Sequence, residues 1–500
     1  MDSCRSVAVP RRRLLLEALV TLAALSGCAV GPDFRPPDAS SAHGYAQTPM
    51  MLPPAGTADA SQHLAPGKDV ADQWWLLFQS PTLNDTVARA IADSPTLEAA
   101  LATLDQARQA ITAASGALYP QADLSAGATR ARLGNGQSAV LVHPVGNVFS
   151  IGPSVSYSPD LFGGLRRQVE EKTALAEFAR YELSAAYLSL TGNAVLQAIA
   201  VATAREQIKA VRDIIDLDEN NVELVLAEQA AGKASAVDVL GARSRLAADR
   251  ALLPPLEQDL AAARDALTII VGSTPAEWTV PDFDLGSLNL PGELPVSLPS
   301  RMVSARPDIL AAQAQLHAAS AAIGVATAQL YPQITLTATW TQAAGTMGAL
   351  FDGTNGLWSV AAGLAAPLLH GGALEAQRQE AIDAFAAQLG VYRQTVLQAF
   401  GQVADVLQAL RHDAEELDAQ GSALNLAQAT LTMSQESFKA GQSNFLQVLD
   451  AQRTFSQARL AYAKAKGQRY TDTTQLFAAM GGGSLESLAP LLRGTNAGSR

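Results

Sequence analysis

The chain has 500 residues, and its composition excludes several classes of protein before any motif is considered. Only 16% of the residues are charged, whereas 48% are hydrophobic and 5% are aromatic. An alanine-rich, aromatic-poor chain favours long packed helices over the core of a globular enzyme. The net charge of −12 argues against nucleic-acid binding, because such binding needs a basic surface.

The first residues have the features of a secretion signal that ends in a lipidated cysteine. Arg11-Arg12-Arg13 precede a short apolar run, which ends in Leu25-Ser26-Gly27-Cys28. This ending resembles the lipobox of bacterial lipoproteins, in which the cysteine thiol accepts diacylglycerol. We therefore expect residues 1–27 to be removed and Cys28 to carry diacylglycerol and an N-acyl chain, with no other cofactor. The alternative is an ordinary signal peptide that happens to contain a cysteine.

The surroundings of Cys28 indicate where the protein goes. Alanine rather than aspartate follows it, which resembles the sorting pattern of outer-membrane lipoproteins. Cys4 lies in the removed segment, so Cys28 is the only cysteine expected in the mature chain, and an intrachain disulfide and a thiolate metal site are excluded. No run of 18 apolar residues follows the signal, so any membrane-spanning part must be built from β-strands.

An internal repeat of about 210 residues organises the chain. Three pairs of segments carry it: Pro95-Thr-Leu-Glu-Ala-Ala through Leu118-Tyr119-Pro120-Gln121 with Pro307-Asp-Ile-Leu-Ala-Ala through Leu330-Tyr331-Pro332-Gln333, Pro159-Asp-Leu-Phe-Gly163-Gly164 with Pro367-Leu-Leu-His-Gly371-Gly372, and Ala231-Gly232 with Ala440-Gly441. Each copy predicts a helix of roughly 30 residues, two strands, a very long helix, a tight turn and a returning helix. We expect these domains: a signal at 1–27, a lipid-anchored extended segment at 28–70, the first repeat at 71–272, a linker at 273–306, the second repeat at 307–482 and a loose tail at 483–500.

The two very long helices are expected from about Leu165 to Gln229 and from about Ala373 to Lys439. Roughly 65 residues make a rod of about 100 Å. Seven-residue spacing predicts coiled-coil packing at Leu417, Leu424, Leu431 and Phe438, and at Ile208, Ile215 and Val222 in the first copy. Pro254-Pro255 interrupts the returning helix of the first copy only, so we expect a break there.

The strand at Ile334–Thr341 has one apolar face and one face of threonines. Further strands are expected at Leu124–Arg132, Val148–Tyr157 and Trp358–Pro367. This alternation is typical of a membrane barrel with lipid outside and water inside, although an amphipathic strand on a soluble core is an alternative. Four strands cannot close a barrel, so a membrane interpretation requires oligomers: two chains give eight strands and three give twelve.

The sequence contains no recognisable catalytic or metal-binding constellation. The six histidines are scattered, and no phosphate-binding glycine loop is present. Trp74-Trp75 is interpreted as core packing at the start of the first helix. We therefore expect neither an enzyme nor a metal site.

Several motifs resemble the OprM/NodT lipoprotein branch of the TolC-type outer-membrane efflux factors. They are Gly31-Pro32-Asp33-Phe34, Trp74-Trp75-Leu-Leu-Phe78, Leu298-Pro-Ser-Arg-Met-Val-Ser-Ala-Arg306-Pro307-Asp308-Ile309, Ile323-Gly324 and Leu449-Asp450-Ala451-Gln452-Arg453. The resemblance implies a mainly α-helical fold with a transmembrane β portion. It further implies a homotrimer whose chains give four strands each to a twelve-strand barrel, and a TolC-like α-barrel of long coiled-coil helices.

The resemblance also implies functional residues and partners. A periplasmic gate maps to Leu446 and Asp450, and the tip that docks a periplasmic adaptor maps to the turns at Gly232-Lys233 and Gly441-Gln442. An inner-membrane pump would supply the energy, and the duct would conduct drugs or other small molecules passively across the bacterial outer membrane.

Two alternatives to the efflux duct remain from the sequence. One is the outer duct of a protein or peptide secretion system, and the other is a structural periplasmic coiled-coil lipoprotein without a pore. The transported substrates, the identity of pump and adaptor, the lumen-facing residues and the trigger of gate opening are not encoded in recognisable motifs.

Overall fold

The computed structural model describes residues 29–37, 44–45, 52, 62–132 and 145–482. The signal, the expected lipidation site Cys28 and the tail at 483–500 lie outside the described residues. Contacts divide the chain into two compact units. The strand unit contains Leu104–Ala179 and Ala312–Tyr392 with the N-terminal residues to Pro37, and the helical unit contains the remainder. Each unit is described by itself.

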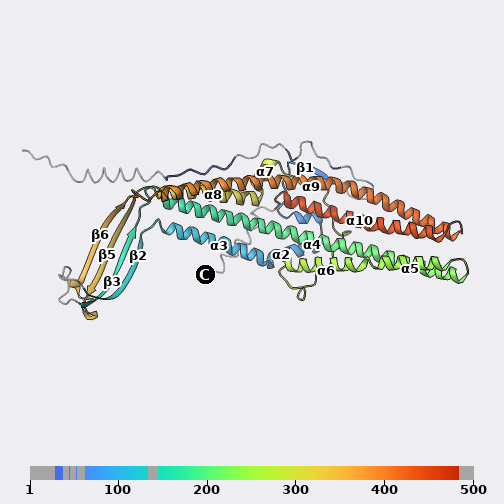
Figure 1. The fold of residues 1–500 in the computed structure, drawn as a ribbon, viewed down its shortest axis with the longest axis horizontal. Helices are drawn as coiled ribbons and strands as arrows, with labels where there is room; N and C mark the ends of the chain where they lie inside the picture. The colour runs from blue at the N-terminus through green and yellow to red at the C-terminus, as the bar shows by residue number, and fades with distance from the viewer. Residues whose placement is uncertain (1–28, 38–43, 46–51, 53–61, 133–144, 483–500) are drawn as a thin grey trace, which may run out of the picture. The chain divides into compact units, whose positions relative to one another are not determined.

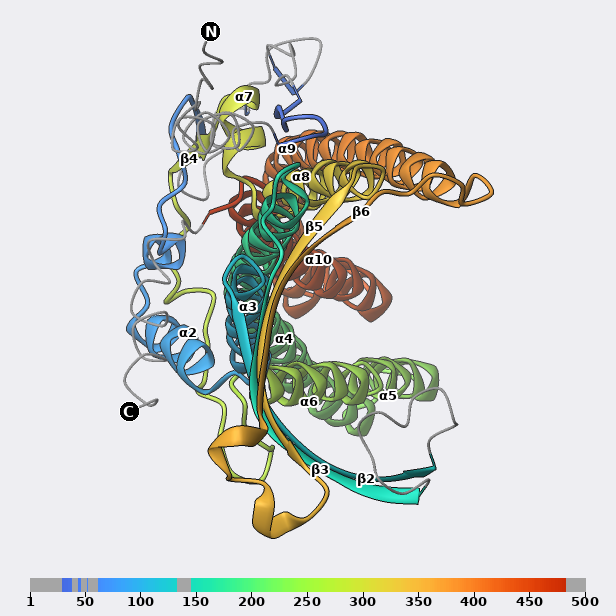
Figure 2. The same ribbon diagram turned by 90° about the vertical axis from the view of Figure 1, so that its left-hand side faces the viewer.

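The strand unit is built around one antiparallel sheet of four strands, in the order β2-β3-β5-β6 (Figure 1). The strands are β2 (Gln121–Arg132), β3 (Val145–Tyr157), β5 (Gln333–Ala344) and β6 (Gly356–Ala365). Each repeat supplies one hairpin, and the β3–β5 pairing joins the two hairpins. Figure 2 shows the strands curving along their length rather than lying flat. The four strands expected from the sequence are therefore confirmed.

The register of the second hairpin separates an apolar face from a polar one. Trp340 lies opposite Trp358 and Leu336 lies opposite Ala362. On the other face the Thr339 hydroxyl is 2.7 Å from that of Ser359. Because residues directly opposite each other share a face, the apolar face of β5 continues across β6, whereas the threonine face of β5 lies opposite Leu357, Ser359, Ala361 and Gly363.

The first helix of each repeat is shorter than expected. We expected roughly 30 residues, but α3 (Pro95–Gly116) and α8 (Pro307–Ala328) have 22 residues each. The Tyr-Pro pairs lie a few residues beyond the helix ends, in short turns that lead into the strands. Proline excludes the helical conformation from its predecessor, so the chain leaves the helix before Tyr119 and Tyr331.

The long helices match their expected bounds closely. α4 (Gly164–Ala230) and α9 (Ala373–Lys439) have 67 residues each. In the second repeat α10 (Phe445–Ala479) returns without interruption, whereas the first repeat uses α5 (Ala236–Arg250) and α6 (Leu253–Ile270). The break at Pro254-Pro255 is confirmed, because proline opens α6 at its first positions, where no amide donor is needed.

The expected coiled-coil seam is partly correct in both repeats. In α9 Leu417 and Leu431 are buried, whereas Leu424 and Phe438 are half-buried. In α4 only Ile208 of the three expected residues is buried, and Ile215 and Val222 are half-buried. The buried seam is instead Val211, Ile214, Asp218, Asn221 and Val225. Two residues of this seam, Asp218 and Asn221, are polar. A search for apolar heptads alone therefore selected the adjacent residues Ile215 and Val222 instead.

The segments expected to be extended contain additional structure in the helical unit. β1 (His63–Pro66) pairs in parallel with β4 (Glu293–Val296), and α7 (Pro299–Ala305) follows. The helical unit also contains the 3-10 helix η1 (Trp74–Phe78) and α2 (Pro81–Asp93). The 3-10 helices η2 (Met347–Ala349) and η3 (Gly353–Asn355) belong to the strand unit. Trp74 is fully buried and stacks on Phe477 with ring centroids 5.3 Å apart, which confirms its expected packing role.

Two described helices, α4 and α8, reach a mean hydropathy of 1.4 and 1.3 over 18 residues, enough to cross a membrane by length and composition. In each window 56% of the residues are buried against other parts of the chain. Core helices of soluble proteins have the same property, so these values do not by themselves indicate a membrane span.

Candidate functional site

Both helical hairpins end in the same glycine-dependent turn. Gly232 and Gly441 have φ values of +74° and +72°, which residues with a side chain adopt rarely. The following amides close the helix ends: Lys233 donates to the Glu228 carbonyl at 2.8 Å, and Gln442 donates to the Ser437 carbonyl at 2.9 Å. All four expected tip residues, Gly232, Lys233, Gly441 and Gln442, are exposed.

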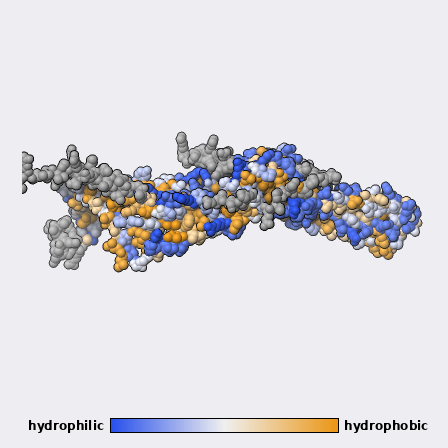
Figure 3. All heavy atoms as spheres, turned by 90° about the horizontal axis from the view of Figure 1, so that it is seen from above, coloured by the Kyte–Doolittle hydropathy of each residue, from blue (hydrophilic) through white to orange (hydrophobic). Residues whose placement is uncertain are grey.

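The residue after each turn caps the returning helix. Ser235 and Asp238 form a capping box at the start of α5, and hydrogen bonds from Ser235 hold the pKa of Asp238 below its usual value. Asn444 accepts from the Gln447 amide at 3.1 Å at the start of α10. Figure 3 shows hydrophobic and hydrophilic residues intermixed over the turn end on the face in view. The tips are therefore preshaped, solvated turns.

An apolar cluster packs the two hairpins against each other behind the tips. It is formed by Val225, Val239, Ala242, Ala427, Leu431, Phe445, Val448, Ala451 and Phe455. These residues come from α4, α5, α9 and α10, so both repeats contribute to one core. The first turns of α10 are consequently held on one face and free on the other.

The two expected gate residues lie on that free face of α10. Leu446 and Asp450 are one helical turn apart, and both are exposed, with Leu446 at 59%. Asp450 accepts a hydrogen bond from Arg453 at 2.7 Å, a partner that the sequence analysis did not assign. The carboxylate is thus balanced by a cation on its own helix. At the equivalent place, the first repeat presents Val237 and Gly241.

A buried polar cluster links α10 to the first repeat close to the gate segment. Gln452 is 1% exposed, donates to Asp218 and accepts from Asn221 at 2.5 Å. Burial and the neighbouring carboxyl of Asp249 of α5 raise the pKa of Asp218 of α4 to about 7. Arg245 forms an ion pair with Asp249 at 2.8 Å.

A second buried carboxyl pair lies in the helical unit. Burial and the neighbouring Asp472 of α10 raise the pKa of Asp413 to about 8, and Arg469 opposes the shift. Sequence analysis missed both pairs. The available signal was polar residues at core positions of a heptad, since Asp218 and Asp413 each occupy such a position.

In the strand unit, Arg167 of α4 clamps the segment that follows Cys28. Arg167 is 5% exposed and donates to the carbonyls of Val30 at 3.2 Å and Gly31 at 3.3 Å, and to Asp33 at 2.8 Å. The Val30 amide donates to the Phe162 carbonyl at 2.9 Å. The segment next to the expected lipidation site is therefore fixed on the helices.

Two sequence motifs meet at this clamp. A Cβ on Gly31 would approach the Gly324 backbone to 2.5 Å, and Phe34 stacks on His317 with ring centroids 4.5 Å apart. His317 also contacts Glu170 at 3.0 Å. The glycines of Gly31-Pro32-Asp33-Phe34 and Ile323-Gly324 are needed for this close approach, a role that the sequence did not reveal.

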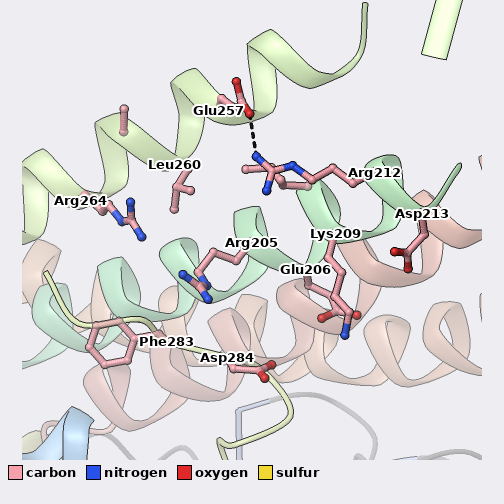
Figure 4. Close-up of a pocket in the computed structure, with 12 residues that line it drawn as sticks. Arg205, Glu206, Lys209, Arg212, Asp213, Glu257, Leu260, Arg264, Phe283 and Asp284 are labelled. Carbon is pink, nitrogen blue, oxygen red and sulfur yellow. Dashed lines mark hydrogen bonds and ion pairs between the residues drawn. The ribbon is translucent and has the colours of Figure 1, made fainter. Parts of the chain in front are cut away.

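The helical unit also contains a charged groove of about 670 Å³ between α4, α6 and the loop at Asp284 (Figure 4). Its cations are largely neutralised by neighbours: Arg212 pairs with Glu257 at 3.0 Å, and Arg264 pairs with Asp282 at 2.8 Å. Within the described residues, no group of three or more His, Cys, Asp or Glu side chains could hold a metal ion. The groove has no arrangement that indicates catalysis.

Comparisons with known proteins agree with this architecture. The sequence model of the outer membrane efflux protein family matches residues 86–273 and 298–482. The pyoverdine export outer membrane protein OpmQ of Pseudomonas aeruginosa is 33% identical over 87% of this chain and 93% of its own length. The toluene efflux pump outer membrane protein TtgF of Pseudomonas putida is 29% identical over 92% and 95%. Nodulation protein T of Rhizobium leguminosarum is 29% identical over 94% and 93%.

Solved structures give the same answer for the fold. The outer-membrane channel OprN superposes on this chain with a TM-score of 0.81 at 27% sequence identity. The superposition covers 91% of this chain and 99% of the OprN chain. The open MtrE outer membrane channel of Neisseria gonorrhoeae, at 24% identity, shows the fold alone, with a TM-score of 0.79 over 91% and 98%. The chain therefore belongs to the outer membrane efflux protein family, in the OprM/NodT branch of TolC-type channels, and is an outer-membrane component of an efflux system.

Proposed function

We propose that three copies of this chain form the passive outer duct of a tripartite efflux system. The observation that carries the proposal is the four-stranded sheet with one apolar face, in a chain that also has two 67-residue helices. An open sheet in hydrocarbon would leave backbone groups unpaired at β2 and β6, at a cost of several kcal/mol per group. Three sheets give twelve strands, which is within the range of known membrane barrels.

Within this duct, the hairpin tips are the place for a periplasmic adaptor. Gly232-Lys233 and Gly441-Gln442 are exposed and held in a fixed turn conformation, as a docking surface requires. The gate would be formed nearby by Leu446 and Asp450 from each copy. Leucine side chains would block the lumen, and the Asp450 carboxylates, each paired with Arg453 of the same helix, would lie one helical turn away.

The energy would come from an inner-membrane pump, and the chain itself would catalyse no reaction. Drugs or other small molecules are the proposed cargo. Support comes from relatives whose names refer to pyoverdine export, toluene efflux and antibiotic efflux. A protein-secretion duct would share the fold, but none of these names favours it.

A lipid on Cys28 would tether the duct to the outer membrane. Support comes from the Arg167 clamp, which holds Val30 and Gly31, the residues that come shortly after Cys28, against the strand unit. Cys28→Ser should abolish incorporation of labelled palmitate into the mature protein. Palmitate labelling that persists in this variant would contradict the anchor assignment.

The duct is tested by the ion conductance of the purified protein in planar bilayers. Discrete conductance steps that require the folded, membrane-extracted protein are expected. A protein that inserts into bilayers without any conductance, or that fractionates with soluble periplasmic proteins, would instead support the coiled-coil lipoprotein without a pore.

A further inference from the structure

A groove of about 370 Å³ lies in the strand unit, between the turn after β3 and the end of α8. The turn and the first residues of α4 form one wall of this strand-unit groove. The last turn of α8 and the start of β5 form the other wall (Figure 1). Six half-buried apolar residues line it: Leu161, Phe162, Leu165, Val325, Ala328 and Ile334. Its volume is within the range of ligand pockets, about 300–1,000 Å³.

The first described residues of the chain lie against the same turn. The Val30 amide donates to the Phe162 carbonyl at 2.9 Å. A Cβ on Gly163 would lie 2.6 Å from the Cα atom of Ala29, so the two backbones are in direct contact. Ala29 is bonded to Cys28. An acyl group attached to Cys28 would therefore begin beside the turn that forms one wall of the groove.

Three glutamine side chains add polar groups to the lining: Gln168, Gln329 and Gln333. In the part of the chain that the structure describes, none of the three has a hydrogen-bond partner for its side chain. Gln121 corresponds to Gln333 in the first repeat, and it donates to two backbone carbonyls near the end of α3 at 2.8 and 3.0 Å. The glutamines of the groove thus have amide donors available for a ligand with acceptor oxygens.

The charge of the lining favours a neutral lipid group over a phosphate. Within the described residues, Asp160 is the only charged residue that lines the groove, and it already pairs with Arg166 at 3.3 Å. Phosphates are held by cations and charge-assisted donors, and a neighbouring carboxylate repels them. The ester oxygens of a diacylglyceryl group carry no charge, so they fit this lining better than a phospholipid headgroup does.

The groove is continuous with the apolar face of the sheet. Ile334 lines the groove at the start of β5, and Leu336 and Trp340 lie on the same face of that strand. This is the face that contacts lipid in the proposed barrel. An acyl chain in the groove can therefore extend along the sheet without crossing a polar surface.

We propose that the strand-unit groove binds one acyl chain of the diacylglyceryl group on Cys28, with the ester oxygens next to the glutamine amides. The occupant is the chain's own lipid, which is thus a ligand of the strand unit as well as a membrane tether. The assignment rests on the proposed lipidation of Cys28.

Photo-cross-linking of the full-length protein in isolated outer membranes tests the site. Cells are grown with a palmitic acid analogue that carries a diazirine on its chain, and the irradiated protein is digested for mass spectrometry. The peptide with Cys28 should be joined to segments 158–168 and 325–334 at least severalfold more often than to segment 367–372. That control segment is the corresponding turn of the second repeat, and its two leucines are almost fully exposed.

The cross-linked products also separate this assignment from the lipidation itself. Palmitate on Cys28 that reaches only membrane lipids or the control segment would overturn the groove, while the lipid anchor stands. Groove segments that carry a phospholipid in place of the N-terminal peptide would overturn the choice of the chain's own lipid. A mature protein without palmitate on Cys28 would overturn the proposed lipidation and this assignment together.

A substitution within the groove provides a second test. Val325→Phe narrows the groove, so the yield of groove cross-links should fall severalfold while the palmitate on Cys28 is unchanged. Leu368→Phe, in the control turn, should leave the yield of groove cross-links unchanged. Circular dichroism of both variants controls for helical content. A wild-type yield in Val325→Phe would overturn the binding of the acyl chain in this groove.

Discussion

The two repeats have the same order of elements but use different residues at corresponding places. The first repeat breaks its returning helix between α5 and α6, whereas α10 of the second runs for 35 residues. Arg167, three residues after Gly164, is a buried clamp for the N-terminal segment. Its counterpart Glu375, three residues after Gly372, is an exposed helix residue paired with Arg378.

Residues that occur in both repeats set the topology of the chain. Residues that occur in only one repeat make the contacts in which the two repeats differ. Both repeats keep the turn glycines and the strand hairpin. Only the first repeat has a buried arginine at the position of Arg167, where it donates hydrogen bonds to Val30 and Asp33. Only the second has a leucine and an aspartate at the positions of Leu446 and Asp450. Substitutions at corresponding positions in the two repeats should therefore have unequal effects at the specialised sites and equal effects at the turns.

The largest expected difference is at Arg167. Arg167→Ala removes a buried guanidinium, leaves the Val30 and Gly31 carbonyls without their donor and leaves Glu170 with His317 alone, so the free energy of unfolding should fall by about 3 kcal/mol. Glu375→Ala is the matched control, with a loss of less than about 0.5 kcal/mol, as for most surface substitutions. Denaturant unfolding of the purified proteins measures both losses. Equal losses in the two variants would contradict a stabilising role of Arg167.

The next effect is a dependence of stability on pH. The folded-state pKa of Asp218 is raised to about 7, above that of the unfolded chain, so its contribution is present in acid and is lost as the pH rises through 7. Between pH 5.5 and 8.5 this amounts to at most about 2 kcal/mol. Asp218→Asn should remove that part of the pH dependence.

A second pH-dependent contribution to stability is expected from Asp413, whose pKa is raised further, to about 8. Asp413→Asn should remove the part of the pH dependence that extends to the more alkaline side. Unfolding curves of the wild type and both variants across this pH range test the assignment, which fails if the variants keep the wild-type slope.

A smaller and equal effect is expected at the two turns. Gly232→Ala and Gly441→Ala each force a side chain into a positive φ and should cost about 1 kcal/mol of local stability. A Cβ at either glycine would meet no atom within 4 Å, so the backbone conformation is the only cause. Hydrogen exchange of the turn amides measures the loss, and a loss in one repeat alone would contradict the equivalence of the tips.

The smallest effect on stability is expected at the gate. Asp450→Ala removes an exposed ion pair with Arg453, worth at most about 1 kcal/mol. If Asp450 faces the lumen in the trimer, the conductance of the closed duct in planar bilayers should nevertheless rise severalfold. Val237→Ala, at the corresponding face of the first repeat, should change the conductance little. Unchanged conductance in Asp450→Ala would count against the gate assignment.

The features that sequence predicted well are the ones encoded locally. The bounds of α9, the break at Pro254-Pro255 and the alternation of β5 each follow from residues adjacent in the chain. Periodicity and proline act over a few residues, so they can be recognised without a partner.

The features that sequence missed depend on contacts between distant segments. The β1–β4 pair joins His63 to Glu293, and the Gln452 cluster joins α10 to α4 and α5. The residue type alone does not show whether a glutamine or an aspartate is exposed to solvent or buried in such a cluster. The polar residues at core heptad positions, Asp218 and Asn221 of α4 and Asp413 of α9, were visible in the sequence, and they were overlooked because the search was for apolar residues.

The most direct test of the account is the native mass of the full-length protein extracted from the outer membrane in detergent. The account predicts a trimer, because four strands with two open edges close only when several copies combine. A monomer in the extract would contradict the barrel and the duct that depends on it.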